Sequence, residues 1–349
     1  MVTLGADTHK ATHTVVAIDE VGRPLGEVTV PATAAGHREL VAWASQFEER
    51  RFALEDVRHL SRRLEADLIK AGERVVRVPT RLMGQARRSG RTRGKSDSID
   101  ALATARAALR EEHLPEAVLE GIERELRILV DHREDYVAER TRFENRLLWD
   151  LHELVPGYQI PPRALSRRKH LEHLGQVLSP FEGVVADVAR ERLEHIRQLT
   201  ARINALESEI IRRVKEIAPT LLALQGCGGL TAAKIVGETA HAGRFHSSAA
   251  FARTNGTAPI PASSALNGRH RLNRGGNRQL NCALHRIAVT QVRMHGRGRI
   301  YVERRKALGD TKTEAIRALR RRISDEVFRR LLADERARSL TPACMPAAA

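Results

Sequence analysis

The chain has 349 residues and carries 59 lysines and arginines against 43 aspartates and glutamates, which gives a formal net charge of +16. This excess of positive charge favours a polyanionic partner, and nucleic acid is the leading class. Aromatic residues make up only 3% of the chain, which argues against a surface that binds single strands by base stacking. The cysteines, Cys227, Cys282 and Cys344, are too far apart in the sequence to suggest a zinc site or a disulfide framework.

Neither a signal peptide nor a membrane span is expected. The N-terminus runs from Met1 directly into a strand-like segment. No apolar run approaches the ~20 residues that a membrane-spanning helix requires. We therefore expect a soluble, cytoplasmic protein with no membrane partner.

The first hundred residues predict an α/β domain. Runs of β-branched and apolar residues predict three strands, after which helices and strands alternate. The predicted strands are 2–6, 12–18, 25–30, 51–54 and 75–78, and the predicted helices are 35–46, 60–71 and one that begins near Asp97. Three antiparallel strands followed by alternating helices and strands are the element order of a ribonuclease-H-like fold.

Two carboxylates, Asp97 and Asp100, stand three residues apart at the start of the last of these helices. Residues with this spacing share one face of a helix, and two like charges there are costly unless a cation neutralises them. A basic run from Arg81 to Lys95 precedes the pair, and carboxylates in a positive field suggest metal-assisted chemistry on a phosphate backbone. The alternative is that both residues only cap the helix and interact with its dipole.

Two further carboxylates favour the metal interpretation. Asp7 ends the first predicted strand and Glu55 ends the fourth, and these strands are neighbours in a ribonuclease-H-like sheet. Asp56 is an alternative to Glu55. Four acidic residues from three elements would build a two-metal site.

Three motifs give the chain a resemblance to a known family. It resembles the bacterial insertion-sequence transposases that have a RuvC-like DEDD domain and are described as recombinases guided by a bridge RNA. The motifs are Gly5-Ala6-Asp7-Thr8-His9-Lys10, Ala53-Leu54-Glu55 and Gly94-Lys95-Ser96-Asp97-Ser98-Ile99-Asp100-Ala101. The resemblance runs over nearly the whole chain.

The resemblance implies roles for residues and partners. It implies that the DEDD set consists of Asp7, Glu55, Asp97 and Asp100, with Mg²⁺ (or Mn²⁺) as the cofactor. It implies double-stranded DNA at the element ends and the target, a guide RNA, and a homo-oligomer that is a dimer or a dimer of dimers. The site of action would be the nucleoid of a bacterium.

Two long helices are predicted over residues 119–154 and 184–217, with apolar residues at steps of three, four or seven. They would form a coiled coil within the chain or between protomers, or a plain helical hairpin that acts as a spacer. The sequence therefore predicts a RuvC-like domain (1–112), a coiled-coil linker (113–217), a mainly helical transposase domain (218–336) and a disordered tail (337–349).

The C-terminal half contains two candidate sites. Gly226 and Gly228 lie in a segment that resembles a helix–hairpin–helix element, in which a tight turn exposes backbone N–H groups to phosphate. The family carries a nucleophilic serine between an Ala-Pro pair and a later Gly-Asn-Arg-like segment. The resemblance therefore places the nucleophile at Ser264, with Ser263 as the alternative.

Basic residues near both candidate sites are predicted to bind nucleic acid. They are Arg87, Arg88, Arg91, Arg93, Lys95, Arg269, Arg271, Arg274 and Arg278. The arginine-rich helix predicted over 313–332 is more typical of a solvated face.

The leading hypothesis for function is an insertion-sequence transposase that cleaves and rejoins DNA through a covalent phosphoserine link. The first alternative is a metal-dependent endonuclease that resembles Holliday-junction resolvases and uses water. The second is a basic coiled-coil protein that binds nucleic acid without catalysis.

Overall fold

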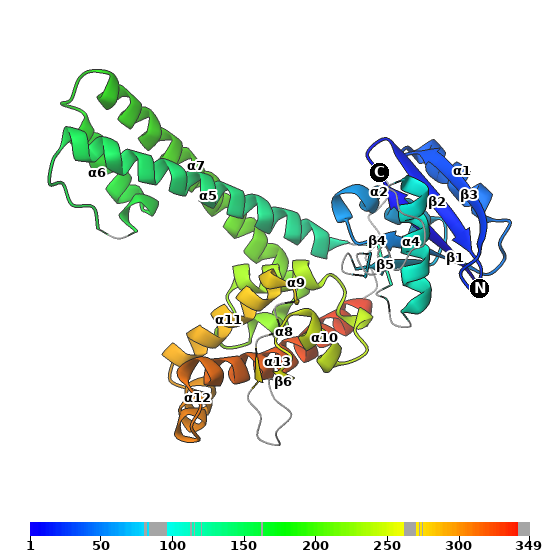
Figure 1. Cartoon of the computed structure of the whole chain (residues 1–349). Coiled ribbons are helices and arrows are strands. Elements are labelled where there is room, and N and C mark those ends of the chain that lie inside the picture. The colour runs from blue at the N-terminus through cyan, green and yellow to red at the C-terminus, as the bar shows by residue number, and fades with distance from the viewer. Residues whose placement is uncertain are drawn as a thin grey trace. The chain divides into compact units, whose positions relative to one another are not determined.

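A computed structural model describes residues 1–79, 82–83, 96–111, 114, 116–119, 121–161, 163–261, 270–271, 273 and 275–340 (Figure 1). Its contacts divide the chain into two compact units, Met1–Glu120 and Gly121–Ala349. The finer division at residues 112, 217 and 336 stays a prediction. Within the part of the chain that is described, no helix is both long enough and apolar enough to cross a membrane.

The first unit is built on a five-stranded sheet with the order β3-β2-β1-β4-β5. Its strands are β1 (Val2–Thr8), β2 (Thr12–Ile18), β3 (Pro24–Pro31), β4 (Arg50–Glu55) and β5 (Val75–Val78). The pairs β1–β2 and β2–β3 are antiparallel, whereas β1–β4 and β4–β5 are parallel. This order and these directions confirm the predicted ribonuclease-H-like fold.

Helices cover both faces of this sheet. One face packs on α1 (Ala34–Ala44) and α2 (Arg58–Lys70) through a core that includes Leu4, Leu54 and Leu64. The other face packs on α4 (Asp97–Arg110), whose alanines meet the buried side chains of β2, β4 and β5. Because side chains alternate along a strand, β1 presents Leu4 and Ala6 to the first face and Gly5 and Asp7 to the second.

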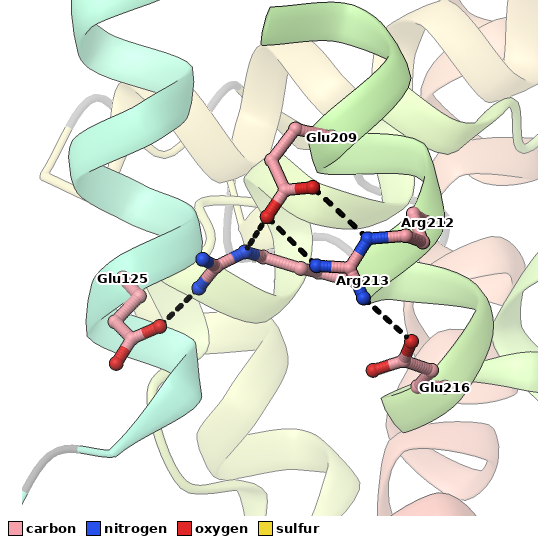
Figure 2. A network of polar contacts seen from close by, with 5 residues as sticks. All are labelled: Glu125, Glu209, Arg212, Arg213 and Glu216. Atoms are coloured by element: carbon pink, nitrogen blue, oxygen red, sulfur yellow. Dashed lines mark hydrogen bonds and ion pairs between the residues drawn. The ribbon is translucent and has the colours of Figure 1, made fainter.

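The second unit begins with two long helices, α5 (Ile122–Leu154) and α7 (Val184–Ile217), which pack along each other within the chain (Figure 1). Ion pairs cross between them, such as Arg133 with Glu207 at 2.5 Å. Figure 2 shows a second such network, in which Glu209 accepts hydrogen bonds from Arg212 and Arg213 while Arg213 also reaches Glu125 on α5. The two arginines lower the pKa of Glu209 to about 2.

Shorter helices complete the second unit. They are α6 (Arg168–Leu178), α8 (Pro219–Leu222), α9 (Gly229–Thr239), α10 (Ser248–Thr254), α11 (Arg278–Arg293), α12 (Arg297–Ala307) and α13 (Lys312–Leu340), with a two-stranded ribbon of β6 (Ile260–Pro261) and β7 (His270–Arg271). A large apolar core joins α7, α9, α11 and α13 to the N-terminal part of α5. The predicted mainly helical C-terminal region is thereby confirmed.

The C-terminal helix is longer than predicted. The sequence predicts a helix over 313–332 and a disordered tail from residue 337, but α13 continues to Leu340. Two contacts to distant residues hold its last turns: Arg338 pairs with Glu123 at 2.6 Å, and Glu335 accepts hydrogen bonds from the backbone N–H groups of Ala242 and Gly243. Residues 341–349 lie outside the described part of the chain.

Candidate metal centre

Two of the predicted carboxylates lie at the ends of adjacent parallel strands. Ala6 of β1 is in register with Leu54 of β4, so Asp7 and Glu55 occupy the next positions of their strands. Both lie on the side of the sheet that α4 covers, because they alternate with residues whose side chains face α1 and α2. Asp56 is exposed and follows β4.

The helix α4 brings the other two carboxylates to the same edge of the sheet. The Ser96 Oγ caps α4 by accepting a hydrogen bond from the backbone N–H of Ile99 at 3.3 Å. Asp97 and Asp100 then fall in the first turn. The helix packs directly on β1, since a Cβ atom placed on Gly5 would lie 2.3 Å from the Ala101 carbonyl oxygen. The absence of a side chain at Gly5 therefore allows the close approach of Asp97 and Asp100 to Asp7.

A histidine joins two of these carboxylates. The His9 Nε2 atom lies 3.1 Å from Asp7 Oδ2 and 3.3 Å from Asp97 Oδ1. Among the described residues, Asp7, His9 and Asp97 form a group whose potential ligand atoms all lie within 4.8 Å of one another. Two carboxylate oxygens and an imidazole nitrogen at this separation fit a single divalent cation.

The electrostatics of Asp7 also favour the binding of a cation. Burial raises the pKa of Asp7, and the negative charges of Asp100 and Asp97 raise it further, while His9 opposes these effects. Its side chain is 14% exposed, whereas that of Asp97 is 54% exposed. A carboxylate whose ionised form is disfavoured in this way gains most from a bound cation.

The structure thus brings together Asp7, His9 and Asp97. Asp100 lies close enough for its negative charge to raise the pKa of Asp7. Glu55 lies at the end of the neighbouring strand, half-buried, outside this three-residue group. The predicted basic residues before α4, Arg87, Arg88, Arg91, Arg93 and Lys95, lie outside the described part of the chain.

Two family models match the sequence. One, described as "Transposase", matches residues 4–156, and the other, described as "Transposase IS116/IS110/IS902 family", matches residues 218–303. The chain belongs to the IS116/IS110/IS902 family of transposases. The first match contains Asp7, Glu55, Asp97 and Asp100, and the second contains Ser264.

Similar proteins come from other insertion elements. The "Insertion element IS116 uncharacterized 44.8 kDa protein" of Streptomyces clavuligerus is 26% identical and is aligned over 95% of both chains. The "Insertion element IS900 uncharacterized 42 kDa protein" of Mycobacterium paratuberculosis is also 26% identical, over 91% of this transposase and 92% of that protein. Among solved structures, a Thermus thermophilus RuvC is 16% identical, with a TM-score of 0.26, over 31% of this chain and 93% of that one.

The region of the candidate nucleophile is described only at its ends. In this transposase, Ser263, Ser264, Arg269 and Arg274 lie outside the described residues, and the backbone of Arg271 belongs to β7. Arg278 is exposed at the first position of α11.

The side-chain amides of Asn255 and Asn277 fix the chain on both sides of this region. Asn255 is fully buried, donates to Ser324 Oγ at 2.8 Å, and accepts from the backbone N–H and the hydroxyl of Thr257. Asn277 caps α11 by accepting the backbone N–H groups of Gln279 and Leu280, and it donates to Glu238 Oε2 at 2.6 Å.

Asn255, Asn277 and Glu238, the partner of Asn277, were not predicted from the sequence. The available signal was the presence of Lys234 and Glu238, four residues apart, in the otherwise apolar segment 229–239. Both charged side chains are buried in α9 of this transposase, 5% and 6% exposed. Buried charges need partners, and Glu238 finds its partners in Asn277 and Arg127.

The glycine-rich connection joins α8 to α9. Gly226 has φ +85°, which favours glycine, and Gly228 is the N-cap of α9. A Cβ atom on Gly226 would lie 3.1 Å from the Ile287 carbonyl oxygen, whereas one on Gly228 would meet no described atom within 4 Å. The preceding helix α8 has only four residues. Gly228 therefore lies beside open space at the start of α9, and its contact with nucleic acid stays a prediction.

Proposed function

We propose that this transposase is a site-specific DNA recombinase that needs a divalent cation, Mg²⁺ or Mn²⁺, and that cleaves and rejoins strands through a phosphoserine link. The single observation that carries the proposal is the convergence of Asp7, Asp97 and His9 on one small volume. The charge of Asp100 beside them and the position of Glu55 on the adjacent strand support the same site. A net charge of +16 suits a DNA partner.

The carboxylates would hold the cation next to the scissile phosphate. When bound, the cation would supply Lewis-acid stabilisation of the charge that builds up on the phosphate oxygens. Asp7, Asp97, Asp100 and Glu55 would position it and orient the phosphate. The same four residues form the metal set that the family resemblance implies.

The hydroxyl of Ser264 would act as the nucleophile. Its oxygen would form a bond to the phosphorus while one phosphorus–oxygen bond of the DNA strand breaks, and the hydroxyl proton would pass to the released strand end. The covalent link conserves the phosphodiester bond energy, so a second strand end can attack the phosphoserine and free the serine again. Arg269, Arg271, Arg274 and Arg278 would bind the phosphates around it.

Target choice and assembly belong to the same proposal. A guide RNA would select the element ends and the target, and protomers would assemble as a dimer or a dimer of dimers. Basic residues ahead of α4 and the N–H groups near Gly226 and Gly228 would contact nucleic acid. Action at the bacterial nucleoid follows from a DNA substrate.

Recovery of a protein–DNA adduct tests the proposal. Cells carrying the intact insertion element would be lysed under denaturing conditions, and DNA covalently bound to the protein would be quantified. Wild type is expected to give an adduct, and Ser264→Ala is expected to give none. The matched variant Ser263→Ala should keep the adduct, and loss of the adduct in Ser263→Ala alone would move the nucleophile to that residue.

Assays of DNA cleavage and DNA binding, with Ser264→Ala and with Asp97→Asn, separate the two alternatives. A metal-dependent nuclease that uses water would cleave DNA in the Ser264→Ala variant and would never form an adduct. A nucleic-acid-binding protein without catalysis would bind DNA equally well in wild type and in Asp97→Asn, and would cleave it in neither.

A further inference from the structure

His9 occupies an unusual place beside the carboxylates. It directly follows β1, and its backbone N–H donates to the Thr12 carbonyl oxygen at 3.0 Å, which closes the turn between β1 and β2. This turn fixes the backbone of His9 two residues after Asp7. The side chain reaches back over the strand end, so that its Nε2 lies near both Asp7 and Asp97.

The distances match the edges of a coordination polyhedron. In an octahedral site with metal–ligand distances of about 2.0–2.1 Å, adjacent ligand atoms lie roughly 3 Å apart. In this structure His9 Nε2 forms a hydrogen bond of 3.1 Å with Asp7 Oδ2 and lies 3.3 Å from Asp97 Oδ1, and both separations are close to that value. The imidazole is 49% exposed, so an ion can reach it from solvent.

We propose that His9 is a nitrogen ligand of the cation held by Asp7 and Asp97, and that it biases this site toward transition-metal ions such as Mn²⁺ over Mg²⁺. The inference rests on the proposed metal site and adds a ligand to it. Mg²⁺ takes almost only oxygen ligands, whereas Mn²⁺, the first of the divalent transition metals, also favours carboxylates but accepts an imidazole nitrogen more readily than Mg²⁺ does. A site with two carboxylate oxygens and one imidazole nitrogen therefore gains more from Mn²⁺ than a site made only of carboxylates.

Electron paramagnetic resonance of Mn²⁺ tests this ligand directly. The full-length protein would be loaded with Mn²⁺ alone, without DNA, and electron spin-echo envelope modulation would be recorded. Wild type is expected to show coupling of the Mn²⁺ electron spins to a directly bound imidazole nitrogen. His9→Ala is expected to lose the coupling, while His152→Ala, which changes an exposed histidine on α5, should keep it.

Affinities give the second measurement. Titration calorimetry would follow Mn²⁺ and Mg²⁺ binding to wild type, His9→Ala and His9→Asn. Loss of the nitrogen ligand should weaken Mn²⁺ binding by about tenfold or more and Mg²⁺ binding by about threefold or less. His9→Asn offers an oxygen ligand and should recover Mg²⁺ binding better than Mn²⁺ binding.

The outcomes separate this inference from the proposed function. If wild type binds Mn²⁺ without nitrogen coupling, or if His9→Ala keeps both affinities, His9 is only a turn residue and the inference is wrong. The carboxylate site itself is judged by Asp7→Asn. Unchanged Mn²⁺ binding in that variant would contradict the metal site of the proposed function, whatever His9 does.

Discussion

The glycine at position 5 allows α4 to pack closely on β1. Only a hydrogen atom fits in place of a side chain at this position, because the backbone of α4 fills the space that a Cβ atom would occupy. The same contact places the first turn of α4, with Asp97 and Asp100, beside Asp7. At the residue scale, the packing of α4 on β1 and the geometry of the candidate metal centre therefore both depend on Gly5.

A Gly5→Ala substitution should lower the stability of the protein and weaken its metal binding. Its Cβ atom would lie 2.3 Å from backbone atoms of Ala101 and Ala105, which have no flexible end to move aside. We expect a loss of at least about 2–3 kcal/mol in the free energy of unfolding, together with weaker metal binding. Gly26→Ala is the matched control in the same sheet, since its nearest neighbour is 3.4 Å away. Denaturant unfolding and a metal titration of both variants test this, and equal stability of the two would contradict it.

The buried histidine of β2 makes the first unit sensitive to acid. His13 is 2% exposed and stacks on His37 with ring centroids 5.3 Å apart. Burial, together with the neighbouring His37 and His9, lowers the pKa of His13 to about 4. Between pH 6.5 and pH 4 the unfolded chain therefore binds more protons than the folded one, so stability falls as the pH falls through this range.

We expect His13 to contribute up to roughly 3 kcal/mol of this pH dependence. Replacing it by leucine should flatten the fall in unfolding free energy between pH 6.5 and pH 4, whatever its effect at neutral pH. The measurement is denaturant unfolding at several pH values, with His152→Leu as an exposed control. An unchanged slope in His13→Leu would show that other groups carry the acid sensitivity.

At the scale of elements, Asn277 both caps the start of α11 and contacts a buried charged residue, Glu238. The Asn277 side chain accepts the N–H groups of Gln279 and Leu280 at 2.9 and 3.0 Å and donates to the buried Glu238. Its own backbone N–H donates to the Thr254 carbonyl oxygen. One residue thus joins α9, α10 and α11 on the C-terminal side of the segment that carries Ser264.

Substitutions at Asn277 separate the cap from the charge contact. Asn277→Ala should cost about 1–2 kcal/mol of unfolding free energy through the lost cap, and more through the buried carboxylate of Glu238 that loses a donor. Asn277→Ser keeps a capping oxygen and should lose only the contact to Glu238. Urea unfolding followed by circular dichroism measures the difference, and identical stabilities for serine and alanine would show that the cap contributes nothing.

The sequence predicts helices and strands well where the pattern that indicates them lies within a short segment of the chain. Alternating β-branched runs predict the strands, and the order of elements predicts the fold, because three of the four strand pairs in the described five-stranded sheet join consecutive strands and only β1–β4 joins strands far apart in the sequence. The end of α13 could not be predicted, since its last turns are held by Glu123, Ala242 and Gly243, each far away in the sequence. The same holds for His9: its proximity to Asp97 depends on how α4 packs, which no spacing in the sequence encodes.

At the scale of the whole molecule, the chain consists of two compact units. The candidate metal centre belongs to the first and the predicted serine to the second, so the proposed reaction needs both. A cation that binds only the folded first unit should stabilise that unit alone.

Calorimetry with and without Mn²⁺ tests this separation. At an ion concentration about 100 times the dissociation constant, the unfolding free energy of the first unit should rise by about 2.7 kcal/mol, while the second unit is unchanged. Hydrogen exchange assigns each transition to its unit. Asp7→Asn should remove the effect, and an equal shift of both units would place the main binding site elsewhere.

The central claim is that the carboxylates at the strand ends and the start of α4 hold a cation that is essential for DNA cleavage. The most direct measurement is the rate of cleavage of element-end DNA by wild type and by Asp7→Asn, at a fixed Mg²⁺ concentration with the guide RNA present. We expect Asp7→Asn to stay folded, as judged by its denaturant unfolding, and to cleave at least about 100-fold more slowly. Cleavage by Asp7→Asn at the wild-type rate would show that DNA cleavage does not need a cation held by Asp7.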